Sequence, residues 1–174
     1  APFRLAVLLH ALDHPTGLHG LLLSAPAIDV NPDLAAWLRP VAQTVGRLLP
    51  TLPTVCSPPD ALSRDPAVVR AAKADPLNDH GRIPARTGAE LLRAGAAAKR
   101  RLSHLQTPFL VLHGTADALV PPAWSKRLYE RAATPDKTLR LYNGLYHEPV
   151  NAPEQAVVLR DLSRWLAARV PTDE

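Results

Sequence analysis

Three short apolar runs constrain the fold of this chain more than any other feature. Each is followed at once by loop-forming residues, and together they span residues 20–24, 109–113 and 138–142. In the first two runs the apolar residues are continuous rather than alternating, which is typical of strands covered on both faces. Apolar residues at helical spacing fill the intervals, over residues 3–13 and 122–133 and after Asn151. Strands that alternate with helices in this way predict an α/β fold with a parallel sheet and right-handed crossovers.

The helix after Asn151 has the clearest pattern. Asn151 is a suitable N-cap. The residues that recur behind it at helical spacing are Val158, Leu162, Trp165, Leu166 and Arg169.

The segment between the first two strands differs from the rest, because it carries no strand signal. Asn31-Pro32 predicts the start of a helix that is kinked at Pro40. Its apolar face would comprise Leu34, Trp37, Leu38, Val41, Val45 and Leu48. Asp65-Pro66 predicts a second helix, and the capping box Thr87-x-x-Glu90 predicts a third. An all-helical insertion between two parallel strands indicates a lid.

Composition excludes several classes of protein. The chain has 174 residues, 47% of them hydrophobic, which suffices for one domain with a substantial core. Its net charge is +4, but the 20 basic residues are spread among acidic ones. Only 5% of all residues are aromatic, so we expect no nucleic-acid partner. No apolar stretch suits a membrane-spanning helix, and the first residues do not read as a signal peptide. We therefore expect a cytoplasmic protein, or one that binds a membrane peripherally.

Two titratable residues follow the second and third strands. Asp117 lies in the loop after residues 109–113, and His147 lies in the loop after residues 138–142. Parallel strands end at the same edge of a sheet, so these loops can converge. A carboxylate that accepts an imidazole N–H fixes the tautomer and stabilises the imidazolium formed in proton transfer. The pair thus suits the acid and base of a nucleophilic triad; spacing alone equally allows an Asx turn at Asp117 and a surface histidine.

The motifs around these two residues resemble a known family. LHGTADALVPP and DKTLRLYNGLYHE are similar to the acid and histidine loops of bacterial and animal monoacylglycerol lipases, which are serine hydrolases. GLLLSAPAIDV, LSRDPAVVRAAKADPL and NAPEQAVVLRDLSRWL extend the resemblance over nearly the whole chain. It implies that Asp117 is the acid, that His147 is the general base, and that His113 is a strand-end residue without a catalytic role.

The resemblance also implies the architecture. We expect a partial α/β-hydrolase fold, with its last three parallel strands, their helices and an all-helical lid. The hydrolase core would comprise residues 1–29 and 106–174, and the lid residues 30–105.

The family's nucleophile elbow, G-x-S-x-G, is absent from the sequence. The resemblance places the serine at or just before Ala1, where the chain reads APFR, and the chain contains no methionine. We therefore expect a truncated sequence; a decayed relative is the alternative. Ser24 lacks flanking glycines and is expected to be structural, Ser103 and Ser125 are weaker candidates, and Cys56 is expected to be a small packing residue.

The resemblance further implies the reaction and the partners. The intact relative would hydrolyse the carboxylic ester of a single-chain lipid, a monoacylglycerol or lysophospholipid, through an acyl-enzyme and without a metal or organic cofactor. This chain alone is expected to be inactive. A non-catalytic module of lid and half-sheet, or a carboxylesterase that acts on other esters, are the alternatives.

Surfaces of the lid and the sheet supply the remaining expectations. Trp37, Leu38 and Val41 are the candidate substrate-binding residues, and the lid would also contact lipid surfaces. An unpaired sheet edge would favour self-association. No metal site is expected, because His10, His14 and His19 straddle a Pro-Thr-Gly turn.

Overall fold

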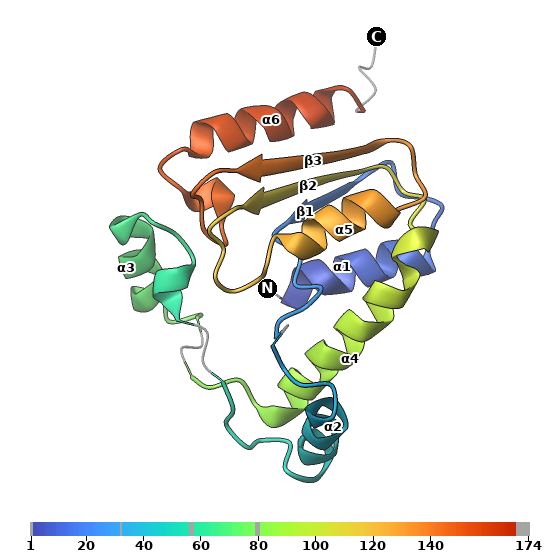
Figure 1. Ribbon diagram of the computed structural model, residues 1–174. Helices are drawn as coiled ribbons and strands as arrows, with labels where there is room; N and C mark the ends of the chain where they lie inside the picture. The colour runs from blue at the N-terminus through green and yellow to red at the C-terminus, as the bar shows by residue number, and fades with distance from the viewer. Residues whose placement is uncertain (1, 32, 56–57, 79–80, 170–174) are drawn as a thin grey trace.

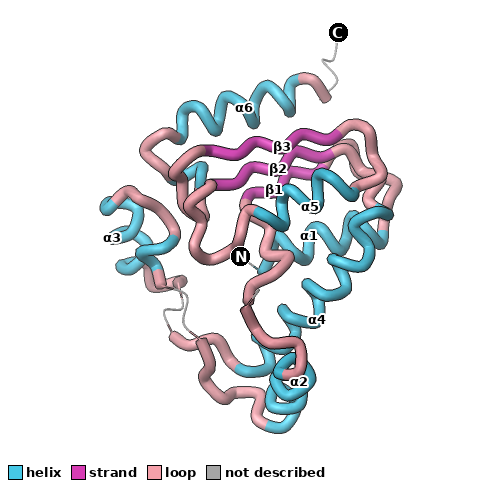
Figure 2. Tube along the Cα trace, in the orientation of Figure 1, coloured by secondary structure: helices cyan, strands magenta, loops and turns pink. Residues whose placement is uncertain are grey.

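The centre of the protein is a three-stranded parallel sheet, seen in a computed structural model that describes residues 2–31, 33–55, 58–78 and 81–169. The strands are β1 (Leu21–Ser24), β2 (Phe109–Gly114) and β3 (Lys137–Tyr142), and they lie in the order β1-β2-β3. Leu21 pairs with Phe109, which in turn pairs with Lys137. Helices cover both faces of this sheet (Figures 1 and 2). The predicted α/β class is therefore confirmed.

The two faces of β2 build two apolar clusters. On one face, Phe109 and Val111 pack with α1 (Pro2–Asp13) and α5 (Ala123–Arg131) through residues that include Leu5, Leu8 and Leu128. On the other face, Leu110 and Leu112 pack with α6 (Gln155–Ala167) through Val158 and Trp165. Because both faces of β2 are buried, its sequence is continuously apolar.

The loops that follow β2 and β3 meet at the carboxyl edge of the sheet. Thr115 donates its backbone N–H to Tyr142 O at 2.9 Å, and Ala116 donates to Leu145 O at 3.0 Å. A Cβ at Gly114 would lie 2.2 Å from Leu145 O, so only glycine permits this approach. The loops are thus fixed side by side where Asp117 and His147 begin their turns.

The lid segment, which we define as residues 30–105, is helical. Its helices are α2 (Leu38–Leu48), the 3-10 helix Pro59–Ala61, α3 (Pro66–Ala74) and α4 (Ala85–Arg101), which runs into the 3-10 helix Leu102–His104. Asp65 caps α3 by accepting the N–H of Ala67 at 2.8 Å, as predicted. Figure 1 shows α2 at the far end of α4 from the sheet. The division of the chain at residues 29/30 and 105/106 stays a prediction.

The predicted start of the first lid helix is wrong. The helix α2 begins at Leu38 instead of at Asn31-Pro32, and turns precede it; Pro32 itself lies outside the described residues. Pro40 falls in the first turn, where an N–H has no intrahelical acceptor, so the physical basis of the predicted kink is absent. The expected apolar face is also largely open, because Trp37 is 70% and Leu48 75% exposed.

Two other helix starts differ from the predictions. The helix α4 begins at Ala85, so Thr87 lies inside it, and Glu90 forms ion pairs with Arg86 and Arg93 instead of closing a capping box. Pro84 precedes α4 directly, and the fixed φ of proline suits a helix entry. At the other end of the chain, Asn151 closes the 3-10 helix Pro149–Asn151, and α6 starts only at Gln155.

No helix among the described residues is both long and apolar enough to cross a membrane.

Candidate active site

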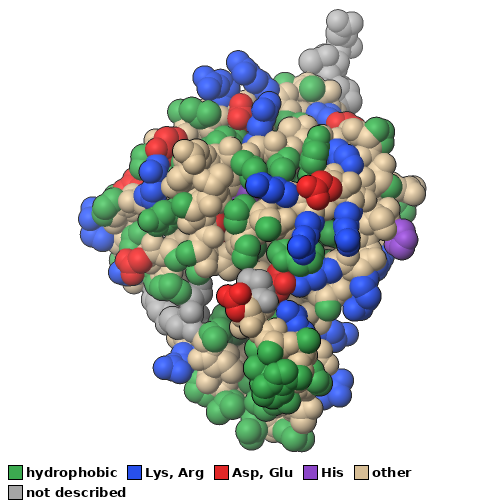
Figure 3. All heavy atoms as spheres, viewed as in Figure 1, with side chains coloured by type: hydrophobic (Ala, Val, Ile, Leu, Met, Phe, Trp, Pro, Cys, Tyr) green, Lys and Arg blue, Asp and Glu red, His purple; other side chains and the backbone are tan. Residues whose placement is uncertain are grey.

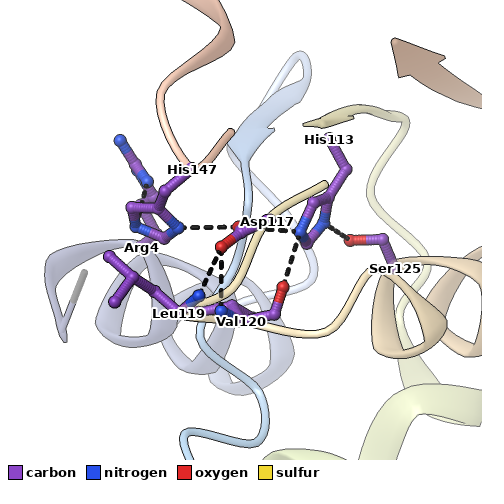
Figure 4. Close-up of polar contacts among 7 residues, drawn as sticks. All are labelled: Arg4, His113, Asp117, Leu119, Val120, Ser125 and His147. Atoms are coloured by element: carbon purple, nitrogen blue, oxygen red, sulfur yellow. Dashed lines mark hydrogen bonds and ion pairs between the residues drawn. The ribbon is translucent and has the colours of Figure 1, made fainter. Parts of the chain in front are cut away.

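Asp117 and His147 lie in direct contact at the carboxyl edge of the sheet. The Nδ1 atom of His147 is 2.8 Å from Asp117 Oδ2, and both side chains are buried (Figure 4). The contact joins residues that are 30 positions apart in the sequence. The parallel order of β2 and β3 places their loops at one edge of the sheet, as predicted.

The loop after β2 holds Asp117 by its second carboxylate oxygen. Asp117 Oδ1 accepts the backbone N–H groups of Leu119 at 2.8 Å and Val120 at 2.9 Å. This is the Asx turn that the sequence left open as an alternative. The structure combines both interpretations, because the turn occupies Oδ1 and leaves Oδ2 for imidazole donors.

A second imidazole contacts Asp117 Oδ2. His113, at the end of β2, is fully buried, and its Nε2 atom lies 3.0 Å from this oxygen and 3.0 Å from Val120 O. Its Nδ1 atom lies 2.6 Å from the hydroxyl of Ser125 on α5. One carboxylate oxygen is therefore shared by two histidines.

These donors keep Asp117 ionised. Burial by itself raises the pKa of the carboxyl, but the hydrogen bonds from His113, from His147 and from the Val120 N–H outweigh it and hold the pKa well below its usual range. An ionised carboxylate is the form that orients an imidazole and stabilises its charged state.

Arg4, in the first turn of α1, lies on the opposite side of His147. Its Nη1 atom is 3.1 Å from His147 Nε2 (Figure 4). A guanidinium can only donate, so Nε2 accepts and the proton of a neutral His147 is on Nδ1, facing Asp117. Burial lowers the pKa of Arg4, and the charges of Glu148 and Asp117 oppose this effect. Arg4 therefore occupies the position beside His147 Nε2 where a nucleophile hydroxyl would lie when this nitrogen takes its proton.

The lid segment anchors the loop of His147. The backbone N–H of Glu148 donates to Leu62 O at 2.9 Å, and the hydroxyl of Ser63 donates to Asn151 O at 2.7 Å. Arg64 adds an ion pair with Glu154. A cleft of about 500 Å³ lies beside these contacts and is lined by residues that include Val69, Arg70 and Tyr146. The lid thus borders the candidate site through its central part, near residues 62–64.

The structure does not bring the predicted substrate-binding residues to the Asp117–His147 pair. Trp37 and Val41 are 70% and 48% exposed, and Leu38 is partly buried where α2 begins. Their role in binding stays a prediction.

The candidate replacement nucleophiles fall into different surroundings. Ser24 Oγ is buried without a hydrogen-bond partner in the described part of the chain, and Ser125 is bonded to His113. Ser103 is exposed in the 3-10 helix after α4, and Cys56 lies outside the described residues. The rings of His10 and His14 contact each other, but the described residues contain no group of three or more metal-binding side chains suited to a metal ion.

From the sequence, Ser125 was considered only as a weaker candidate nucleophile, Arg4 was given no role, and His113 was expected to be a strand-end residue without a catalytic role. A signal existed for His113, because it stands four residues before Asp117, with a turn at residues 115–116 between them. The hydroxyl of Ser125 could not be placed from its helical spacing alone. For Arg4, which is 143 positions from His147, the sequence holds no local signal.

Comparisons with known proteins agree with this architecture. The chain is 38% identical over 164 residues to the monoacylglycerol lipase of Mycolicibacterium smegmatis. The match covers 94% of this chain and 59% of that protein. It is 32% identical to the rat monoglyceride lipase, over 94% of this chain and 55% of the relative. The crystal structure of the Paleococcus ferrophilus monoacylglycerol lipase matches with a TM-score of 0.86 and 31% identity, over 96% of this chain and 65% of that one.

The matches define both the relationship and its extent. The chain spans a little more than half the length of these curated relatives. The resemblance to monoacylglycerol lipases and the partial α/β-hydrolase fold are confirmed. The model of the Hydrolase_4 family, described as serine aminopeptidase S33, matches residues 5–154, and the chain belongs to that family.

Proposed function

We propose that Asp117 and His147 are the acid and the base of a serine-hydrolase site that cleaves carboxylic esters of single-chain lipids. The observation that carries the proposal is the 2.8 Å contact between His147 Nδ1 and Asp117 Oδ2, with both side chains buried at the carboxyl edge of the sheet. Residues 1–174 contain no G-x-S-x-G elbow, so the proposal concerns the acid and base half of the site.

In the proposed reaction each of these atoms has a task. With its proton on Nδ1, His147 presents the Nε2 lone pair to a nucleophile hydroxyl and takes its proton as the hydroxyl attacks the ester carbonyl. Asp117 stabilises the imidazolium, which then protonates the leaving alcohol. In the second half-reaction His147 removes a proton from water as the water oxygen attacks the acyl carbonyl. The imidazolium then returns the proton to the nucleophile oxygen as its bond to the acyl group breaks, which releases the carboxylic acid.

Two observations support a lipid ester as the substrate class. The curated relatives quoted above are named monoacylglycerol and monoglyceride lipases. Figure 3 also shows apolar side chains gathered over α2 at the lower end of the molecule. The exposed large residues of this region are Trp37, Val41, Leu48, Leu49, Leu52 and Val55. An exposed apolar patch of this kind suits contact with a lipid surface.

A hybrid enzyme tests the proposal. The part of the M. smegmatis lipase that precedes the matched region is joined to residues 5–174 of this chain. This hybrid is designed to supply the serine that the family resemblance places before this segment, and it removes Arg4. We expect hydrolysis of monoacylglycerols, with longer acyl chains preferred over acetyl esters. The substitutions His147→Ala and Asp117→Asn should each lower kcat by about 10³-fold or more, since the corresponding aspartate change in a serine protease lowers it about 10⁴-fold.

Matched surface variants are the controls. His104→Ala and Asp33→Asn change exposed residues of the same types and should leave kcat within about twofold of the unmodified hybrid. Hydrolysis that survives His147→Ala would contradict the assignment of the base, and a preference for acetyl esters would contradict the lipid class.

A second candidate function is a non-catalytic, lipid-binding module. The contact of Arg4 with His147 Nε2 favours it, because that nitrogen already has a donor. We expect the 174-residue chain not to react with a fluorophosphonate probe. Stoichiometric labelling that disappears in His147→Ala would contradict the non-catalytic candidate and would show that the chain holds its own nucleophile.

A further inference from the structure

The buried histidine at the end of β2 makes three polar contacts, and their partners determine its protonation. Asp117 Oδ2 and Val120 O each lie 3.0 Å from His113 Nε2. An ionised carboxylate and a carbonyl both lack a proton, so Nε2 must carry one and donate it. With Nε2 protonated, the neutral ring accepts the hydroxyl proton of Ser125 at Nδ1 over 2.6 Å.

The two histidines therefore hold opposite tautomers around one oxygen. His147 donates from Nδ1 and His113 donates from Nε2, and both donate to Asp117 Oδ2. The other oxygen is held by the N–H groups of Leu119 and Val120. Figure 4 shows the resulting chain from Ser125 through His113 and Asp117 to His147. Every strong acceptor position of the carboxylate thus faces a fixed donor.

Packing alone does not account for an imidazole at this place. The side chain of His113 is fully buried, and an apolar side chain would fill the volume without two ring nitrogens that need partners. Full burial also denies His113 direct contact with a substrate. Its polar atoms are directed at Asp117 and at the groups that hold its own ring.

We propose that His113, held by Ser125, is a positioning residue that fixes Asp117 Oδ2 in line with His147 Nδ1. The inference rests on the proposed function in that the Asp117–His147 pair is the unit being positioned. Two N–H donors on one oxygen restrain carboxylate rotation and spread its negative charge. The proton between Asp117 and His147 then stays on the imidazole, which leaves Nε2 of His147 as the acceptor.

Nuclear magnetic resonance on the 174-residue chain tests this inference without substrate. Histidine labelled with ¹⁵N reports each tautomer, and aspartate labelled at the carboxyl with ¹³C reports the titration of Asp117. We expect Nε2–H in His113 and Nδ1–H in His147. A His113 with its proton on Nδ1 would overturn the proposal, because Asp117 would then lose a donor.

Two substitutions separate positioning from packing. His113→Leu removes the donor, so the midpoint of the Asp117 titration should rise by about one pH unit or more, and the Nδ1–H resonance of His147 should broaden. His113→Gln keeps an N–H at the same end of the side chain and should restore most of both signals. A Leu variant that melts at a lower temperature yet keeps the original Asp117 midpoint would show a packing role only and would overturn the proposal.

Ser125→Ala decides the question if the Leu variant does not fold. It keeps the His113 N–H but releases the ring at Nδ1, so a smaller rise in the Asp117 midpoint supports the inference, and an unchanged midpoint contradicts it. His104→Leu, at an exposed position, is the control for a histidine replacement. Neither the histidine tautomers nor the Asp117 titration midpoint requires turnover. An inactive hybrid enzyme would therefore count against the proposed function and leave the positioning result unaffected.

Discussion

The sheet half of the molecule and its lid segment are stabilised in different ways. The sheet half, with α1, β1–β3, α5 and α6, buries large apolar side chains such as Leu8, Phe109 and Leu128 completely. In the lid segment, the buried residue of α2 is Gly46 and that of α3 is Val69, while α4 buries alanines and a glycine. Leu102 and Leu105, at the end of the segment, are fully buried because they belong to the apolar cluster of the sheet half. Among the described residues, seven of the thirteen exposed large apolar side chains belong to the lid segment, including Leu77 at 92% and Leu48 at 75% exposure.

The difference shows where function is placed. His113 lies at the end of β2, and Asp117 and His147 lie in the loops after β2 and β3. All three side chains are buried, and both histidines are hydrogen-bonded to Asp117. The lid segment leaves an apolar surface open, which suits a part of the protein that meets a variable, lipid-like partner. The sheet half therefore holds the site residues in fixed positions, and the open surface of the lid segment suits a partner of variable shape.

The largest stability effect should follow from a matched pair of leucine truncations. Leu8→Ala removes a fully buried side chain from the cluster beneath the sheet and should lower the free energy of unfolding by about 2–5 kcal/mol. Leu48→Ala removes a side chain that is 75% exposed on α2 and should change it by no more than about 0.5 kcal/mol. Urea denaturation measures both, and equal losses would abolish the proposed contrast.

The next effect is electrostatic and depends on pH. The pKa of Asp117 is lower in the folded chain than in the unfolded chain, so the unfolded state binds the extra proton and ionised Asp117 stabilises the fold above about pH 4. At pH 7, Asp117→Asn should lower the free energy of unfolding by about 1.5–3 kcal/mol, since hydrogen bonds to a charged group are lost.

The pH profile provides the check on this prediction. The difference between the original chain and Asp117→Asn should shrink as the pH falls from about 4 toward the folded pKa. Asp33→Asn, at an exposed position, should follow the original chain at every pH. A difference that stays constant from pH 7 to the acid limit would contradict a lowered pKa.

Two glycines of α4 should respond in opposite directions. A Cβ at Gly95 would lie 2.5 Å from Ile28 O, in the segment that follows β1, so Gly95→Ala should destabilise by about 1–3 kcal/mol. At Gly88 the nearest atom is Thr54 Oγ1 at 3.9 Å, so Gly88→Ala should stabilise by about 0.5–1 kcal/mol through helix propensity. Thermal denaturation distinguishes them, and a stable Gly95→Ala protein would show that α4 does not press on the chain after β1.

The smallest effect concerns the open surface of the lid. Trp37→Ala should weaken binding to phosphatidylcholine vesicles that contain phosphatidylglycerol by about three- to tenfold. Phe3→Ala changes a similarly exposed aromatic residue on α1 and should not alter binding. Co-sedimentation with vesicles measures both, and an equal loss in the two variants would show that apolar exposure, and not the lid surface, governs lipid contact.

Most of the sheet half was predictable from the sequence. The strands β1, β2 and β3 lie within one residue of their predicted positions. Burial on both faces explains the continuous apolar run of β2, whereas β1 exposes Leu22, against the expectation, and β3 is only partly buried. Parallel topology then placed Asp117 and His147 at one edge, and the structure has them in contact. The strand positions depend on features that each segment carries by itself, and the convergence of the two loops follows from the parallel order of two such strands.

The failures lie where contacts from distant segments decide the outcome. α2, which begins at Leu38, packs on α4 at Gly46, where a Cβ would lie 2.7 Å from that of Ala89. Arg4 reaches His147, and Ser125 reaches His113, through packing of whole elements. Sequences that fit a capping box, such as Thr87-x-x-Glu90, also occur by chance inside helices. Here the carboxylate of Glu90 forms ion pairs with Arg86 and Arg93.

The rate at which a fluorophosphonate labels the serine of the hybrid enzyme tests the central claim most directly, because it measures activation of the nucleophile without substrate turnover. If the Asp117–His147 pair is the acid and base, His147→Ala should slow labelling by about 10³-fold or more, and His104→Ala should leave the rate unchanged. Labelling at the original rate in His147→Ala would contradict the account.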